Sequence, residues 1–167
     1  LGLGAPIGIW ERMALRCQST RNYAAGPILW YTAAFPTRAL SGQSALVPGS
    51  IEEFFRDART GNLPNFALID PDFKVNDAYP THSLALCEAF LSSIVRAMAD
   101  GPQWRRSLLV ITFDEHGGYF DHVPPPRTVD PRSDFRQLGF RVPALAIGPT
   151  VWQGGVVSTD LEHVSVA

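Results

Sequence analysis

The feature that most restricts the fold of this sequence is the apolar run at residues 108–113, which holds two leucines, a valine, an isoleucine, a threonine and a phenylalanine. Residues of this kind favour β-structure. A strand that is apolar along its whole length suits a sheet covered on both faces, as in a parallel sheet between helices. Apolar segments at residues 28–31, 66–69 and 142–147 predict further strands, and the Pro- and Gly-containing residues 36–50 read as a loop.

Helical patterns alternate with these strands. Apolar residues recur at intervals of three and four between residues 84 and 98, which predicts a helix over residues 81–99. A capping box, serine followed three residues later by glutamate, predicts a helix from residue 51 to about residue 59 that stops at Gly61. Similar spacing predicts a short helix within residues 7–17. The alternation indicates an α/β fold with a central, largely parallel sheet flanked by helices.

Length, hydropathy and charge exclude several classes of protein. The 167 residues suffice for one domain. The sequence contains no run of 18 consecutive apolar residues, so we expect no transmembrane helix. A net charge of −2 gives no broad basic surface, so nucleic acid is not an expected partner. The two cysteines, Cys17 and Cys87, match no metal or redox spacing. We expect both to be small buried apolar residues, with a single disulfide as the alternative in an exported protein.

The segment at residues 112–122 carries the clearest chemical signal. It follows the apolar run directly, and five of its eleven residues are aspartate, glutamate or histidine. Ligand sites of open α/β sheets form outside the carboxyl ends of strands, and these side chains suit divalent cations. Asp114 and Glu115 can share one ion only if the strand has already ended, which Gly117 and Gly118 would allow. The alternative is a polar loop that only caps a strand.

The same segment carries a family resemblance. Residues 111–126 resemble the signature of the phosphoesterase family, which contains bacterial and plant non-specific phospholipases C and certain acid phosphatases. Residues 61–71 and 101–104 are similar to family segments before the signature, and residues 135–149 and 161–165 to segments after it. The resemblance is close from residue 50 onward and loose before it.

The resemblance implies an alkaline-phosphatase-like fold, of which residues 1–167 would be the C-terminal part of a single domain. It implies metal-dependent hydrolysis of a phosphoester through a hydroxyl nucleophile and a covalent phospho-enzyme. Asp114 and Glu115 would ligate a divalent metal ion of unknown identity. His82, expected in the first turn of the 81–99 helix, would contact the phosphoryl or leaving group, and its alternative is a solvent-facing residue.

The remaining polar residues of the signature region receive weaker assignments. His116 is a second catalytic candidate, or it orients its neighbours by hydrogen bonding. Asp121 and His122 would bind substrate or hold site residues in place, although Asp121 also suits a plain ion pair with His122 or an arginine. Glu162 and His163 would join the site from the closing motif of the family.

The sequence also departs from the family pattern. Residues 76–80 lack a histidine that phospholipases of the family usually carry before the proline, and neither the Glu-Asn metal motif nor the Thr or Ser nucleophile is found. We therefore expect an incomplete domain that is inactive alone, without a signal peptide. The implied substrates are phospholipids, with peripheral membrane contact, and family members are often secreted or periplasmic. The alternatives are an acid phosphatase acting on soluble phosphomonoesters and a non-catalytic fragment or degenerate homologue.

Overall fold

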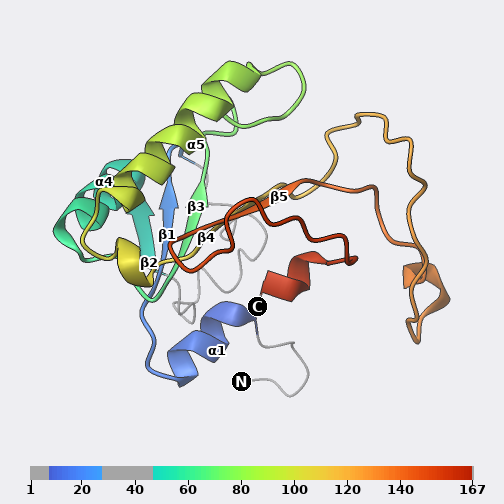
Figure 1. Cartoon of the computed structure of the whole chain (residues 1–167), viewed down its shortest axis with the longest axis horizontal. Coiled ribbons are helices and arrows are strands. Elements are labelled where there is room, and N and C mark those ends of the chain that lie inside the picture. Colours follow the sequence, from blue (N-terminus) through green and yellow to red (C-terminus); the bar gives the residue numbers. More distant parts are fainter. Residues whose placement is uncertain (1–7, 28–46, 167) are drawn as a thin grey trace. The chain divides into compact units, whose positions relative to one another are not determined.

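The computed structural model describes residues 8–27 and 47–166 (Figure 1). The chain divides into two compact units, one running to Trp104 and the other spanning Arg105–Val166. The predicted strand at residues 28–31 lies outside the described residues. No helix among the described residues has the length and apolar character needed to cross a bilayer.

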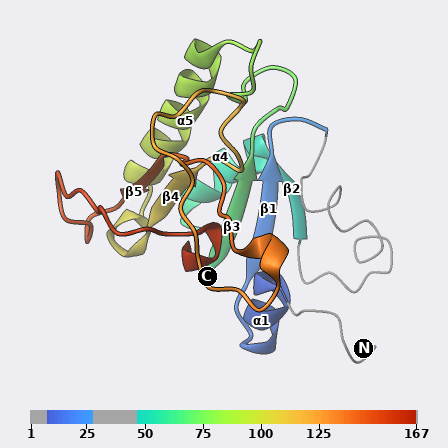
Figure 2. The same cartoon turned by 90° about the vertical axis from the view of Figure 1, so that its right-hand side faces the viewer.

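The first unit is built on a parallel three-stranded sheet. Strand β1 (Thr20–Ala24) lies between β2 (Val47–Ser50) and β3 (Phe66–Asp70), as Figure 2 shows. Strand β3 confirms the strand predicted at residues 66–69. The other two strands were not predicted, and β2 falls within residues 36–50, where the sequence indicated a loop. A parallel sheet flanked by helices agrees with the predicted α/β class.

Helix α4 (Ile51–Thr60) has the boundaries that its capping signals predict. The Ser50 side chain accepts a hydrogen bond from the Glu53 amide, and the Glu53 carboxylate accepts one from the Ser50 amide. Gly61 ends the helix with φ of 76°, a left-handed conformation that favours glycine. The reciprocal bonds satisfy two amides that would otherwise lack partners at the start of the helix.

Side chains from β1 pack against α4. Tyr23 is fully buried, with its ring centroid 5.5 Å from that of Phe54, and its hydroxyl donates to Asp57 Oδ2 at 2.8 Å. Burial raises the pKa of Tyr23, and the bond to Asp57 raises it further. The Arg21 guanidinium donates to Asp57 at 2.9 Å and to Glu53 at 2.8 Å. These contacts join the central strand to one helix through both apolar and ionic side chains.

Helix α5 (Leu84–Ala99) begins three residues later than predicted. Thr81 has a positive φ of 88° and Ser83 is the N-cap residue, so His82 lies before the helix and the expectation that places it in the first turn is wrong. Cys87, Ile94 and Met98 are buried, as their spacing indicates. At the far end, a Cβ on Gly101 would lie 2.5 Å from the Ala58 carbonyl oxygen, which requires glycine at this close approach.

Helix α1 (Ile9–Leu15) is shorter than the predicted helix within residues 7–17. Trp10 is its buried residue, and its ring lies 4.9 Å from that of Phe66 on β3. Cys17 follows the helix with φ of 55° and is exposed, so the expectation of two buried cysteines is correct only for Cys87. Both thiols are free.

The second unit contains an antiparallel pair. Strand β4 (Leu109–Thr112) pairs with β5 (Ala144–Ile147), so the apolar run does not belong to a parallel sheet as predicted. Leu108 is 59% exposed, and none of the described residues of β4 is buried. An apolar run specifies a strand but not its partner, and here the chain returns to form a ribbon. The short helices η1 (Trp104–Arg106), η2 (Ser133–Phe135) and η3 (His163–Val166) complete the described elements.

Candidate functional site

Asp114 and Glu115 lie in a turn immediately after β4. The strand ends at Thr112, so the two carboxylates are not held on opposite faces of a strand, and the condition for sharing an ion is met. Glu115 Oε2 accepts a hydrogen bond from the Gly117 amide at 2.8 Å. Gly117 and Gly118 have φ of 67° and 73°, a left-handed conformation that turns the chain sharply. Both acidic residues are exposed.

His116 lies beside this turn. Its Nδ1 is 3.4 Å from Glu115 Oε2, and its ring centroid is 4.6 Å from that of Phe140. Phe140 comes from the segment that returns to β5, so the histidine is held between the acidic turn and a distant part of the same unit. The catalytic and the orienting roles of His116 both stay predictions.

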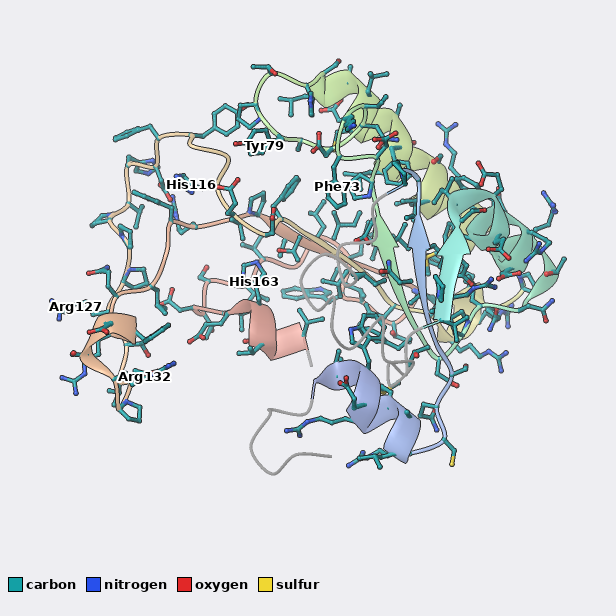
Figure 3. The ribbon with its side chains drawn as sticks, turned by 180° about the vertical axis from the view of Figure 1, so that it is seen from behind. Phe73, Tyr79, His116, Arg127, Arg132 and His163 are labelled. Atoms are coloured by element: carbon teal, nitrogen blue, oxygen red, sulfur yellow. The ribbon has the colours of Figure 1, made fainter. Side chains whose placement is uncertain are left out.

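The structure brings His163 to the same turn. Its Nε2 is 2.7 Å from the carbonyl oxygen of Phe113, the residue before Asp114. Helix η3 carries His163, which Figure 3 labels. When Nε2 donates to this carbonyl, the neutral ring keeps its lone pair at Nδ1. Glu162 is exposed, and its amide donates to the Ser165 hydroxyl at 3.1 Å.

Asp121 forms an ion pair with an arginine, one of the two alternatives that the sequence left open. Its carboxylate accepts two hydrogen bonds from the Arg141 guanidinium, at 2.7 and 2.8 Å. These bonds lower the pKa of Asp121 well below its usual range, with help from the Val123 amide. His122 Nδ1 is 3.8 Å from Asp121, and its side chain is 84% exposed. Asp121 therefore has an anchoring contact within the loop, whereas His122 faces solvent.

His82 belongs to the first unit and has a partner that sequence reasoning missed. Its Nδ1 contacts Asp77 Oδ1 in a short hydrogen bond, and its amide donates to the Tyr79 carbonyl at 2.9 Å. The His82 side chain is 28% exposed, whereas that of Asp77 is 13% exposed. An aspartate five residues before a histidine, in a proline-containing turn, is the sequence signal that could have revealed this pair.

A second polar pair that the sequence did not indicate lies within the parallel sheet. Asn22 on β1 is fully buried, and its Nδ2 donates to Asp70 Oδ2 at 3.0 Å. Asp70 is the last residue of β3 and is also buried. The pair lies toward the carboxyl end of the parallel sheet, where ligand sites of α/β folds usually form.

The acidic turn has the right donor chemistry for a divalent cation. Carboxylate oxygens suit hard cations, and imidazole suits several transition metals. Within residues 8–27 and 47–166, however, no group of three or more histidine, cysteine, aspartate or glutamate side chains is placed to hold a metal. Asp114 and Glu115 can therefore supply part of a ligand set, and the described residues do not complete it.

Comparison with known proteins identifies relatives of this chain. It is 35% identical over 139 residues to non-specific phospholipase C6 of Arabidopsis thaliana, covering 68% of this chain and 27% of that protein. Non-specific phospholipase C1 of the same plant is 34% identical, with 68% and 26% covered. Phospholipase C A of Mycobacterium tuberculosis (strain ATCC 25618 / H37Rv) is 26% identical over 161 residues, with 84% and 31% covered.

The chain thus spans between a quarter and a third of the length of these relatives. A family comparison matches residues 21–167 to the Phosphoesterase family. The match includes the acidic turn, His82 and the closing histidine segment, and it begins earlier than the region of close resemblance noted in the sequence. The chain belongs to the Phosphoesterase family.

Proposed function

We propose that this chain is the C-terminal part of a single phosphoesterase domain that hydrolyses phosphoester bonds, most like a phospholipase C acting on phospholipids. The observation that carries the proposal is the Asp114–Glu115 turn at the end of β4, inside the segment matched to the Phosphoesterase family. Relatives named phospholipase C support the substrate class. The parallel sheet flanked by helices is compatible with the alkaline-phosphatase-like fold that we propose for the complete domain.

In this proposal Asp114 and Glu115 hold a divalent metal ion from one side. A bound ion would withdraw charge from the phosphoryl oxygens and so stabilise the charge that develops there. The remaining ligands and the hydroxyl nucleophile come from outside the described residues. Both carboxylates are exposed and so accessible to a metal ion, and the bond between Glu115 and the Gly117 amide holds one carboxylate in the turn.

His82 is the proposed proton donor to the leaving oxygen. Asp77 accepts a hydrogen bond from Nδ1 of the ring, which leaves Nε2 as the nitrogen able to face the substrate. A fixed ring orientation matters because proton transfer requires a donor within hydrogen-bond reach of the leaving group. His163 has a structural role in this proposal. Its hydrogen bond to the Phe113 carbonyl holds the backbone just before Asp114 in place.

The test compares the complete protein that contains this chain with its Asp114→Asn/Glu115→Gln double variant. We expect release of phosphorylated head group from phosphatidylcholine, abolished by a chelator and restored by divalent cations. The double variant should lose at least roughly a hundredfold in kcat, because neutral amides bind a cation weakly. Asp160→Asn, which changes an exposed carboxylate of the same unit, is the matched control. Full activity in the double variant would contradict the site assignment.

The substrate class is tested in the same experiment. A soluble phosphomonoester is offered beside phosphatidylcholine, and a preference for the monoester would favour the acid phosphatase alternative. A third alternative is a non-catalytic fragment or degenerate homologue, which the missing nucleophile motif and the missing histidine before Pro80 favour. Calorimetric titration of the 167-residue chain with divalent cations, together with its own hydrolysis assay, separates metal binding from turnover.

A further inference from the structure

Between β4 and β5 the chain makes an excursion that is held by its own hydrogen bonds. We call residues 126–138 the distal hairpin. The Thr128 amide donates to the Arg136 carbonyl at 2.9 Å, and the Leu138 amide donates to the Pro126 carbonyl at 3.0 Å. Gln137 Nε2 closes the base by donating to the Pro125 carbonyl at 2.8 Å. These hydrogen bonds give the distal hairpin a defined conformation.

The distal hairpin presents apolar side chains to solvent. Val129 is 98% exposed and Phe135 is 51% exposed. Helix η2 carries Phe135, and the Arg132 guanidinium lies 3.8 Å above its ring. An arginine stacked on an aromatic ring combines an apolar surface with a cation that can reach outward.

The charge of the distal hairpin differs in sign from that of the chain. It contains three arginines and two aspartates, a balance of +1, whereas the chain as a whole carries −2. Figure 3 shows Arg127 and Arg132 at the end of the excursion away from the two strands. Arg136 also donates from Nε to the Asp130 carbonyl at 2.9 Å, which ties one arginine across the tip.

We propose that the distal hairpin docks the protein on an anionic phospholipid surface. Val129 and Phe135 enter the boundary between head groups and acyl chains, and the arginines contact lipid phosphates. At this boundary, aromatic and aliphatic side chains contact the acyl chains, while neighbouring arginines remain hydrated and are attracted to anionic head groups. The inference rests on the proposed function, because an enzyme that hydrolyses phospholipids must reach an assembled lipid surface.

The first experiment measures binding of the 167-residue chain to sedimented vesicles, without any turnover. We expect binding to phosphatidylcholine vesicles that contain about a third phosphatidylglycerol, and weaker binding to pure phosphatidylcholine. Val129→Ser/Phe135→Ser should reduce the affinity at least roughly tenfold. The matched control is Val156→Ser/Val157→Ser, which alters two valines of the same unit that are 83% and 71% exposed but lie outside the hairpin.

A second readout remains valid even if the serine variants fold poorly. In a Cys17→Ser background, Val129→Cys is labelled with a polarity-sensitive fluorophore, while Cys87 stays buried and unlabelled. Vesicles should shift the emission of the label at position 129 to shorter wavelength and leave a label placed by Val156→Cys unchanged. Absence of vesicle binding, equal losses in the two serine pairs, or equal emission shifts at both positions would overturn the proposal. Self-association of the chain through the distal hairpin, detected by sedimentation without vesicles, would also overturn it.

The outcome is separable from that of the proposed function. Hydrolysis of a short-chain, monomeric phosphatidylcholine by the complete protein reports the chemistry without a lipid surface. Hydrolysis of the monomer without vesicle binding leaves the proposed function standing and removes the docking surface. Vesicle binding without hydrolysis of the monomer would support the docking surface and contradict the proposed function.

Discussion

Ionic and hydrogen-bonded contacts fix two of the candidate site residues, Asp121 and His82. Asp121 is bound by Arg141 through two hydrogen bonds, and His82 is bound by Asp77. Each contact joins residues of one unit across a loop or turn. Removing one partner of each pair should therefore change a different measurable property. Removal of Asp77 should change the ring tautomer of His82, and removal of Arg141 should change how stability depends on pH.

Asp77 is a positioning residue in this view, and Asp77→Ala tests it. Without the carboxylate, the ring of His82 should lose its preference for a proton on Nδ1, which nitrogen-15 spectra of the histidines report directly. Loss of one hydrogen bond to a charged group should also lower the free energy of unfolding by about 1–2 kcal/mol. Asp100→Asn, an exposed carboxylate at the end of α5, is the control. An unchanged His82 spectrum would contradict the assignment.

The Asp121–Arg141 pair predicts a pH dependence. Because the folded-state pKa of Asp121 lies below its unfolded value, the pair stabilises the fold above about pH 4, and this stabilisation is lost as the pH falls toward the lowered pKa. Urea denaturation should find Arg141→Gln less stable than the parent at neutral pH, with the difference narrowing below about pH 4. Arg127→Gln should show no such convergence. A difference that is constant with pH would argue against the pair.

Among the elements, those with local signals were predictable. Helix α4 has its start and stop encoded within a few residues, by the capping box at Ser50 and by Gly61. Strand β1 was missed because its sequence is largely polar, and Arg21 and Asn22 become compatible with a central strand only through partners far along the chain. Strand β2 was missed because Pro48 and Gly49 indicate a loop, although an edge strand tolerates both.

The candidate site likewise has a part that the sequence predicts and a part that only the fold reveals. The acidic turn is contiguous, so its residues and its glycines were visible in the sequence before the structure. The contact between His163 and the Phe113 carbonyl spans 50 residues, and only the fold reveals it. The late start of α5 depends on the positive φ of Thr81, which no periodicity of apolar residues encodes. Local chemistry was thus predictable, whereas its partners were not.

The two long helices offer a matched test of capping. Ser50 accepts a hydrogen bond from the third residue of α4, whereas Ser83 at the start of α5 makes no side-chain capping bond. We expect Ser50→Ala to lower the free energy of unfolding by about 1 kcal/mol and Ser83→Ala to leave it nearly unchanged. Thermal or urea denaturation followed by circular dichroism measures both. Equal losses in the two variants would show that the capping box has no specific role.

At the scale of the molecule, the two units differ in the depth of their packing. Every described residue that is buried, including Tyr23, Phe54 and Ile94, belongs to the first unit. The described residues of the second unit include no buried side chain, although the strand that carries the acidic turn is apolar. Hydrogen bonds of a strand pair open more readily when few apolar contacts cover them.

This difference predicts the pattern of native-state hydrogen exchange. Amides of β1 should exchange at least roughly tenfold more slowly than those of β4, which corresponds to about 1.4 kcal/mol in the free energy of opening. The comparison between Tyr23 and Ile111 is the most direct, since both lie in the interior of a paired strand. Equal protection would indicate that β4 and β5 are covered as well as the parallel sheet. Faster exchange at β4 would show that the strand pair before the acidic turn opens more readily than the parallel sheet. If Asp114 and Glu115 bind a divalent cation, as we propose, added divalent cations should slow exchange there.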